Sequence, residues 1–354
     1  VSDAEARGLH VIVDFHQDAY SRYSLGGCGE GFPSWAVHSS IGLQIPKNDN
    51  SCSGWGANMI FDTSHHATWS EFHKDSEGAK TRYVAMVKAV ADRMSQHRNV
   101  IGYELINEPW GTDTELKNLY EAVGSAIRDR DPERILFVPP HALVSSGMPD
   151  NNIPRVSFSN IVYSPHFYDG NVVMLGFWWG NSPAGSLDKM RNKAKSWSAP
   201  MLLGEYGANH SVSNASSYIE SLYNWLDANF VSGTQWNWTP GWNSATKDGW
   251  NAEDLSIVDH NNQLRPKLYK PRPYPQQTAG TPVTFKRSSK GFTYSWTHNP
   301  ALGETVLFLP AGYANGKYIN YNGTQAAISC SVNGQRMTCL GTQSGKASVT
   351  LTAP

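Results

Sequence analysis

The sequence has almost no surplus of charge, because 29 Lys and Arg residues are balanced by 30 Asp and Glu residues. The formal net charge is −1 and the pI is near 6.9. Such a chain has no broad electrostatic attraction for nucleic acid or for an anionic membrane. It also has no apolar run of membrane-spanning length and no signal-peptide pattern. We therefore expect a soluble protein, mature or partial, with an uncharged partner, no nucleic acid ligand and no transmembrane segment.

Cysteine is scarce as well, with 4 residues in the chain. They form two locally spaced pairs, Cys28 with Cys52 and Cys330 with Cys339. Neither pair has CxxC spacing or histidines at metal-ligand intervals, which argues against zinc. The spacing suits two disulfides, and disulfides persist in oxidising compartments. The cysteines thus predict a secreted or extracytoplasmic protein with no metal site.

Aromatic side chains are plentiful, with 13 Trp and 16 Tyr. Flat apolar rings with polar edges are the surfaces on which sugar rings stack, although ordinary core packing accounts for about half of them. Weaker candidates for such contacts lie in or near predicted loops: Trp55, Trp110, Trp178, Trp179 and Trp242.

The first 270 residues alternate short apolar runs with segments of helical periodicity, a pattern typical of a parallel sheet wrapped by helices. Strands of such a sheet are buried on both faces and read as nearly continuous apolar runs. The predicted strands are 9–15, 100–106, 135–138, 161–164, 201–204 and 234–238. The predicted helices are 78–97, 115–130, 187–196 and 216–230. We expect a catalytic domain over 1–270 built as a (β/α)8-type TIM barrel, here incomplete.

The remaining residues have a different pattern. The stretch 271–282, PRPYPQQTAGTP, predicts a linker. Residues 283–354 carry short alternating runs between Gly and Asn turns, which predicts a small β-sandwich domain. The second cysteine pair, with Asn333 and Gly334 between, would close one hairpin of this domain.

Polar residues cluster directly after four of the predicted strands. The clusters are His16-Gln17-Asp18, Asn107-Glu108, His166-Phe167-Tyr168 and Glu205-Tyr206. In a (β/α)8 barrel the carboxyl ends of the strands are where the active site is built. Four clusters at equivalent positions therefore predict one site.

Within that site, Glu108 and Glu205 form a pair of carboxylates suited to glycoside hydrolysis. Cleavage of a β-glycoside with retention needs two carboxyl groups about 5 to 5.5 Å apart, one as acid/base and one as nucleophile. Burial beside a second carboxylate helps the acid to keep its proton near neutral pH. Asn107 could donate to the sugar 2-hydroxyl, and the Tyr168 phenol could hold Glu205 ionised.

Two motifs around these glutamates, ELINEPW (Glu104 to Trp110) and LLGEYG (Leu202 to Gly207), resemble the acid/base and nucleophile signatures of glycoside hydrolase family 5. VIVDFHQDAYSRY, GEGFPSWAV, NIVYSPHFYD and PRPYPQQTAG are similar to its endoglycoceramidase branch, together with steryl-glucosidase and glucocerebrosidase-like relatives. The resemblance implies Glu108 as acid/base, Glu205 as nucleophile and no cofactor. It also implies a substrate-binding set consisting of His16, Asp18, Asn107, His166, Tyr168 and Trp236, the last as a sugar platform.

Members of this family begin with two further β/α units and carry an arginine after the second strand, beside the nucleophile. The present chain contains about six units. Open sheet edges are costly. If the chain is complete, we expect it to be a homo-oligomer, with low activity unless a partner supplies the missing contact. The alternatives are a fragment of a longer protein, or loops such as 26–65 folding across the gap.

The resemblance leaves the substrate open. A glycolipid is one interpretation; a soluble β-glucoside or a β-1,4-glucan, cleaved by a β-glucosidase or endoglucanase, is a second. A third, from another functional class, is a low-activity sugar-binding protein on a glycosidase scaffold. For single residues, His16 could be a core histidine, Trp236 could fill the barrel, and His65-His66 is expected to be a loop feature and not a metal site.

Overall fold

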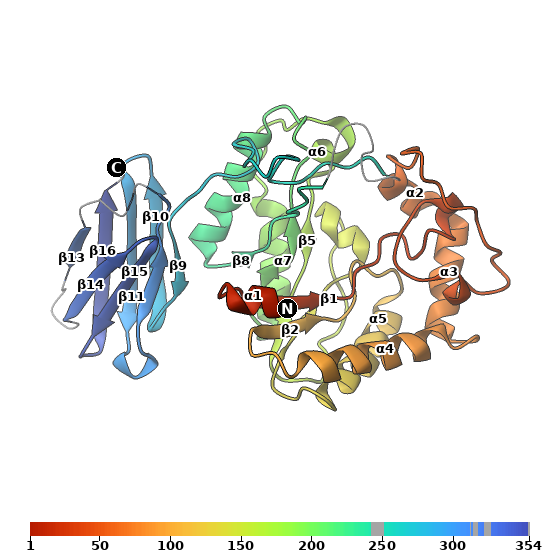
Figure 1. Ribbon diagram of the computed structural model, residues 1–354, viewed down its shortest axis with the longest axis horizontal. Coiled ribbons are helices and arrows are strands. Elements are labelled where there is room, and N and C mark those ends of the chain that lie inside the picture. Colours follow the sequence, from red (N-terminus) through yellow and green to blue (C-terminus); the bar gives the residue numbers. More distant parts are fainter. Residues whose placement is uncertain (242–250, 312, 314–317, 322–326, 353–354) are drawn as a thin grey trace. The chain divides into compact units, whose positions relative to one another are not determined.

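The computed structural model describes residues 1–241, 251–311, 313, 318–321 and 327–352 (Figure 1). The chain divides into two units, one made of Val1–Ala215 with Gly233–Leu268 and the other of Ser216–Ser232 with Tyr269–Pro354. The first unit combines parallel strands with helices, and the described residues of the second combine two antiparallel sheets with one α-helix and a short 3-10 helix.

Four parallel strands frame the first unit, in the order β1-β2-β3-β4. Their bounds are β1 (Val11–Asp14), β2 (Val100–Glu104), β3 (Ile135–Val138) and β4 (Ile161–Tyr163). The residues of β2, β3 and β4 are mostly buried, as apolar strands covered on both faces should be. All four lie inside the predicted strands.

The strands that follow are short and form two separate two-stranded sheets, β5 (His166–Phe167) with β7 (Glu205–Tyr206) and β6 (Leu202–Leu203) with β8 (Ser232–Gly233). Pro165 separates β4 from β5, because proline has no N–H to give to a ladder. The strand predicted at 234–238 is wrong in detail, since β8 ends before it. The backbone N–H groups of Thr234 and Trp236 nevertheless donate to Leu203 and Tyr206, which extends the arc of the TIM-barrel-like domain.

Seven α-helices are described in the first unit: α1 (Ser2–Ala6), α2 (Trp55–Phe61), α3 (Thr63–Lys74), α4 (Ala79–Met94), α5 (Asp113–Arg128), α6 (Gly170–Leu175) and α7 (Ala184–Ser196). Helix α5 begins with a capping box in which Thr112 and Glu115 satisfy each other's backbone N–H groups. Helix α3 corrects the expectation that His65 and His66 lie in a loop.

The segment between β1 and α3 is closed by a disulfide between Cys28 and Cys52, with a Cα–Cα distance of 5.6 Å. Both cysteines are buried in a small cluster with Ala19 and Leu25. Nearby, Tyr20 lies edge-on to Trp69 of α3. The predicted first disulfide is therefore present, and it ties this segment together beside the end of β1.

The two ends of the arc are less buried than its middle. Val11, Ile12 and Val13 of β1 are only half-buried, and both residues of β8 are exposed. In the described part of the chain, β2 is the one strand that pairs with β1. The expected self-association of the chain stays a prediction.

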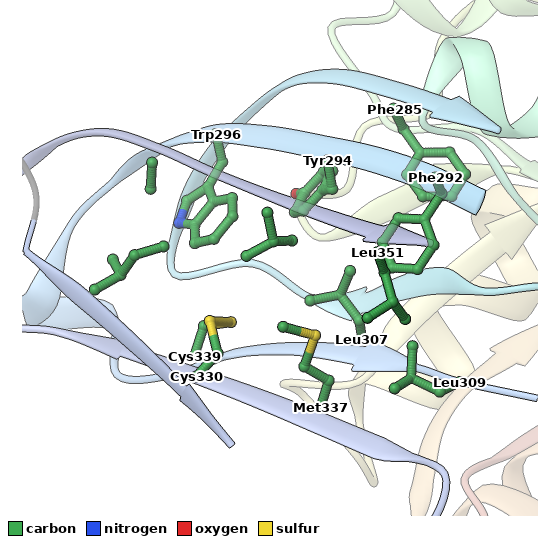
Figure 2. Close-up of a cluster of buried hydrophobic side chains, with 13 residues drawn as sticks. Phe285, Phe292, Tyr294, Trp296, Leu307, Leu309, Cys330, Met337, Cys339 and Leu351 are labelled. Atoms are coloured by element: carbon green, nitrogen blue, oxygen red, sulfur yellow. A yellow bond between two sulfur atoms is a disulfide. The ribbon is translucent and has the colours of Figure 1, made fainter. Parts of the chain in front are cut away.

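The second unit is a sandwich of two four-stranded antiparallel sheets, β10-β11-β16-β13 and β14-β15-β12-β9. The strands are β9 (Tyr274–Gln277), β10 (Gly280–Ser288), β11 (Gly291–His298), β12 (Thr305–Phe308), β13 (Tyr318–Tyr321), β14 (Ile328–Asn333), β15 (Arg336–Gly341) and β16 (Gly345–Thr352). Figure 2 shows the core between the sheets, where Tyr294 and Trp296 lie above Leu307 and Met337. A disulfide joins Cys330 to Cys339, which are directly opposed in the β14–β15 hairpin.

Two boundaries of the second unit differ from expectation. Strand β9 lies inside the segment predicted as a linker and pairs with β12, so part of that segment belongs to the sandwich. Helix α8 (Ala215–Asn229), predicted as a barrel helix, groups almost entirely with the sandwich. Its Glu220 pairs with Arg287 at 3.1 Å and its Asp227 with Arg272 at 3.2 Å.

Candidate active site

Glu108, His166 and Glu205 meet where three strands of the first unit end. Nδ1 of His166 lies 3.1 Å from Oε1 of Glu108 and 3.6 Å from Oε2 of Glu205. One ligand-type atom of each residue lies within 4.8 Å of those of the other two. The predicted carboxylates are therefore brought together, at a spacing that fits the roughly 5 Å of a retaining pair better than the wider gap of an inverting one.

The backbone of Glu108 is held in an unusual conformation. Its φ of 31° is positive, which is rare for a residue with a side chain and typical of functional sites. Gln17 stabilises this turn, because its Nε2 donates to the carbonyls of Asn107 at 2.6 Å and Glu108 at 3.2 Å. Gln17 is absent from the predicted site residues. Its position between His16 and Asp18, in a polar cluster after a predicted strand, is the sequence signal that could have indicated its role.

Glu205 is nearly enclosed and accepts a hydrogen bond from the Tyr168 hydroxyl at 2.7 Å. Burial raises the pKa of Glu205 to about 8, with the Glu108 charge acting in the same direction and the His166 charge opposing it. Two close carboxylates with such a pKa hold one proton between them at neutral pH. The Tyr168 hydrogen bond acts against this rise, because it favours the ionised form of Glu205.

Asn107 is oriented by two acceptors. Its Nδ2 donates to the Gln17 carbonyl at 2.9 Å and to Asp18 Oδ1 at 3.1 Å, which uses both of its N–H groups. Its Oδ1 is buried with no hydrogen-bond partner. The expectation that Asn107 donates to a sugar hydroxyl is therefore corrected, because only an acceptor remains free.

His16 lies between two carboxylates. Its Nδ1 is 2.8 Å from Asp14 and its Nε2 is 3.0 Å from Asp18. Burial lowers the pKa of His16, but the two aspartates outweigh this and raise it to about 11, so the ring is an imidazolium. It stacks on Trp236 with ring centroids 5.0 Å apart. This ionic arrangement is not that of an ordinary core histidine.

Glu104 is a second residue that the predicted site omits. It ends β2, is 7% exposed, and its Oε1 accepts from Ser164 Oγ at 3.1 Å. The same oxygen lies 3.7 Å from Nε2 of His166, on the far side of the ring from Glu108. The signal in the sequence is a charged residue inside an otherwise apolar strand, since buried carboxylates are rare unless paired.

Trp110, two residues beyond Glu108, lies among histidines. His66 stacks on its indole at 4.7 Å, and His65 and His141 contact it at 5.4 and 4.5 Å. Burial lowers the pKa of His65 and of His141 to about 4, so both rings are neutral near pH 7. A cavity of about 370 Å³ opens beside Trp110, lined in part by His66, Trp69, His73 and Glu115.

The other tryptophans are more dispersed. Trp55 donates its indole N–H to Glu253 at 2.9 Å. Trp179 is 67% exposed and Trp178 is half-buried, both shortly after α6. Trp242 lies outside the described residues.

Two groups of side chains have spacings that a metal ion could use: Glu108 with His166 and Glu205, and His16 with Asp18 and Glu30. In each group the histidine already contacts a carboxylate: His166 contacts Glu108, and His16 contacts Asp18. Hydrogen bonding accounts for these contacts, and we assign no ion to either group.

Comparison with known families gives two matches. Residues 1–241 match the family described as "Cellulase (glycosyl hydrolase family 5)". Residues 272–352 match "Glycoside hydrolase family 5 C-terminal domain". The two matches together span both units.

Among characterised relatives, endoglycoceramidase I of Rhodococcus hoagii is 25% identical over 352 residues, covering 87% of this chain and 64% of its own length. Endoglucanase E-5 of Thermobifida fusca is 32% identical over 111 residues, which is 29% of this chain and 23% of the relative. The chain thus spans less than two thirds of the length of these relatives.

Solved structures share the fold. Endo-glycoceramidase II from Rhodococcus sp., in a complex with ganglioside GM3, has a TM-score of 0.75 at 22% identity, covering 99% of this chain and 82% of its own. Sterylglucosidase 1 of Cryptococcus neoformans has a TM-score of 0.77 at 15% identity, with the same coverage. Among the described residues, no helix has both the length and the apolar character needed to cross a bilayer.

Proposed function

Because the chain belongs to glycoside hydrolase family 5, we propose that it cleaves β-glucosidic bonds with retention of configuration, using Glu108 as acid/base and Glu205 as nucleophile. The observation that carries this proposal is the close pair of carboxylates, in which one oxygen of Glu108 lies within 4.8 Å of one oxygen of Glu205. This close approach favours the short carboxylate separation of a retaining pair over the wider one that an inverting mechanism needs for its water.

In the first step, a Glu205 carboxylate oxygen attacks the anomeric carbon while the bond from that carbon to the leaving oxygen breaks. Glu108 gives its proton to the leaving oxygen, so that the aglycone departs as an alcohol. The Tyr168 hydroxyl, 2.7 Å from Glu205, keeps the nucleophile oriented and favours its ionised form.

In the second step, water attacks the anomeric carbon of the glycosyl-enzyme and transfers a proton to Glu108. The bond to Glu205 breaks, which returns the carboxylate and the protonated acid. Asn107, directly before Glu108 in the chain, is held by the Gln17 carbonyl and Asp18 Oδ1 and so fixes the position of the acid/base. Trp236, backed by His16, provides the stacking surface for the sugar. Both steps need only water and these side chains.

For the aglycone, we propose a lipid, in keeping with the name of the Rhodococcus hoagii relative. A group of exposed apolar side chains supports this: Val173, Met174 and Leu175 of α6 with Trp179, which we call the α6 apolar patch. Met174 is 73% and Trp179 is 67% exposed. Helix α6 begins two residues after Tyr168, so the patch adjoins the site in the chain.

A soluble glucan is the alternative substrate class, favoured by the local match to an endoglucanase. A product analysis on glucosylceramide, lactosylceramide, a steryl glucoside and cellotetraose separates the two. Release of sugar from the lipids at a much higher kcat/KM than from cellotetraose supports the lipid proposal, and the reverse order refutes it. Proton NMR of the first-formed sugar tests retention, since an α-anomer from a β-substrate would exclude it.

We also propose an extracytoplasmic location, on the basis of the two disulfides. Mass spectrometry of the natively expressed protein, with and without reduction, tests whether the Cys28–Cys52 and Cys330–Cys339 bonds form in the host.

A further inference from the structure

Glu104 is a buried ionisable residue for which the proposed reaction has no use. Its side chain reaches from the end of β2 into the interior, and it is 7% exposed. One of its oxygens accepts a hydrogen bond from Ser164 Oγ at 3.1 Å. A carboxylate at this depth is costly unless a positive group lies close to it.

The positive group beside Glu104 is His166. The ring is 3% exposed, its Nε2 faces Glu104 Oε1 at 3.7 Å, and its Nδ1 faces Glu108 at 3.1 Å. A Cβ on Gly204 would lie 3.0 Å from both Cδ2 and Nε2 of the ring. The backbone of Gly204 therefore closes one side of the ring, and a glycine at this position lets the imidazole fit between the carboxylates.

Other titratable groups act on this pair from several elements. Asp14 of β1 acts on Glu104 as a negative charge. Tyr83 of α4 and Tyr120 of α5 also interact with Glu104, and each donates its hydroxyl to a backbone carbonyl, of Leu105 and Pro139 respectively. On the His166 side, the charged neighbours are Glu108 and Glu205. His166 is thus the cation that lies between Glu104 and the Glu108/Glu205 pair, whereas the His16 imidazolium pairs with Asp14 at 2.8 Å.

We propose that Glu104 is a positioning residue of the active site: its carboxylate is the counter-ion of a His166 imidazolium and aims Nδ1–H of the ring at the Glu108/Glu205 pair. An imidazolium donates from both nitrogen atoms, whereas a neutral ring donates from one and can present the other as an acceptor. By holding His166 as an imidazolium, Glu104 ensures that the ring presents an N–H donor, and not an acceptor, to the Glu108/Glu205 pair. This inference rests on the proposed hydrolysis, because the pair it serves is the catalytic pair of that reaction.

The proposal has a definite electrostatic consequence. Burial raises the pKa of Glu104, and the His166 charge acts against this. If Glu104 is ionised, its replacement by Gln removes one negative charge from a coupled cluster, so every proton in the cluster is held less tightly. Both limbs of the bell-shaped profile of kcat/KM then move to lower pH, by on the order of one pH unit.

The pH profile of hydrolysis of an aryl β-glucoside by Glu104→Gln tests this directly. Glu104→Asp keeps the charge and should retain the wild-type profile, even at a lower kcat. Asp131→Asn is the matched control, because Asp131 is also 7% exposed and hydrogen-bonds Tyr103 at 2.8 Å, away from His166. A Glu104→Gln profile that keeps both limbs unmoved, or an equal shift in Asp131→Asn, overturns the proposal.

A second measurement needs neither activity nor a folded variant at position 104. Nitrogen-15 NMR of histidine-labelled wild-type protein reports whether both ring nitrogens of His166 carry protons at pH 7, with the resonance assigned by its loss in His166→Gln. A doubly protonated ring is expected, and a neutral ring overturns the proposal. A charged His166 in a chain that hydrolyses no glycoside would leave the ion pair standing and refute the proposed function instead.

Discussion

The hydroxyl of Tyr168 donates a hydrogen bond to Oε2 of Glu205 across 2.7 Å. Tyr168→Phe removes this donor, so the pKa of Glu205, already raised to about 8, should rise further. Less of the enzyme then carries an ionised nucleophile at pH 7. We expect kcat/KM for an aryl β-glucoside to fall about 10- to 100-fold, the range for losing a hydrogen bond to a charged group.

The matched control is Tyr163→Phe. Tyr163 is fully buried, and its hydroxyl accepts from Asn151 at 3.2 Å, outside the carboxylate pair. This change should lower stability and leave kcat/KM within a few-fold of wild type. An equal loss of activity in both variants would mean that Tyr168 acts through packing alone.

The pH dependence of the wild-type reaction follows from the shared proton. The active form has one proton on the Glu108/Glu205 pair, and the pKa of about 8 at Glu205 marks where the last proton leaves. We expect kcat/KM to decline above about pH 8, with the pKa belonging to the pair and not to either residue alone. Activity that keeps rising to pH 10 would contradict a protonated acid in the mechanism.

The raised pKa of Glu205 also predicts a pH-dependent stability difference. The native pKa of about 8 exceeds the unfolded value of about 4.3, so from pH 4 to pH 8 the native chain holds a proton that the unfolded chain releases. The proton on native Glu205 makes its full contribution to the free energy of unfolding below pH 4. This contribution falls as the pH rises from 4 and is lost once the pH has risen through 8. Glu205→Gln mimics the protonated form and escapes this loss.

Glu205→Gln should therefore match wild-type stability near pH 4 and exceed it at pH 8, by on the order of 4 kcal/mol. Urea unfolding of both proteins, followed by a probe in the first unit, measures the difference. A constant gap between pH 4 and pH 8 would show that Glu205 does not titrate in this range.

The α6 apolar patch predicts a split between membrane-borne and soluble substrates. Met174→Glu puts a charge on a side chain that is 73% exposed, which should weaken contact with a lipid surface without disturbing the core. We expect at least a five-fold lower rate on glucosylceramide in vesicles and no change on an aryl glucoside. Met86→Glu on α4, at a side chain that is 45% exposed, is the matched control and should change neither rate.

Much of the barrel could be predicted because β2, β3 and β4 are buried on both faces. Their sequences are therefore nearly continuous apolar runs without helical periodicity, which predicts strands and not helices. The sequence pattern does not predict helix α3, because its inward face carries histidine and threonine as well as aromatic residues. A hydropathy pattern does not register such a face, although the spacing of Thr68, Trp69 and Phe72 is helical. The apolar aromatics of 234–238 predict a strand there, whereas β8 ends at Gly233 and the segment extends the arc through the backbone N–H groups of Thr234 and Trp236.

The catalytic pair could be predicted because each glutamate follows a strand, and strand ends of a parallel sheet converge. The orientation of Asn107 could not, since it depends on the Gln17 carbonyl and Asp18 Oδ1 lying beside the same amide. The role of Glu104 was hidden for a similar reason. Its partner His166 is 62 positions away in the sequence, and only the fold makes them neighbours.

The most direct test of the account is the configuration of the glycosyl azide that each glutamate variant forms from an activated β-glucoside. In Glu205→Ala, azide can replace the missing nucleophile and should yield an α-azide in one inversion. In Glu108→Ala, the glycosyl-enzyme still forms, and azide should attack it to yield a β-azide. Proton NMR distinguishes the two products. A β-azide from Glu205→Ala, or an α-azide from Glu108→Ala, would contradict the assigned roles.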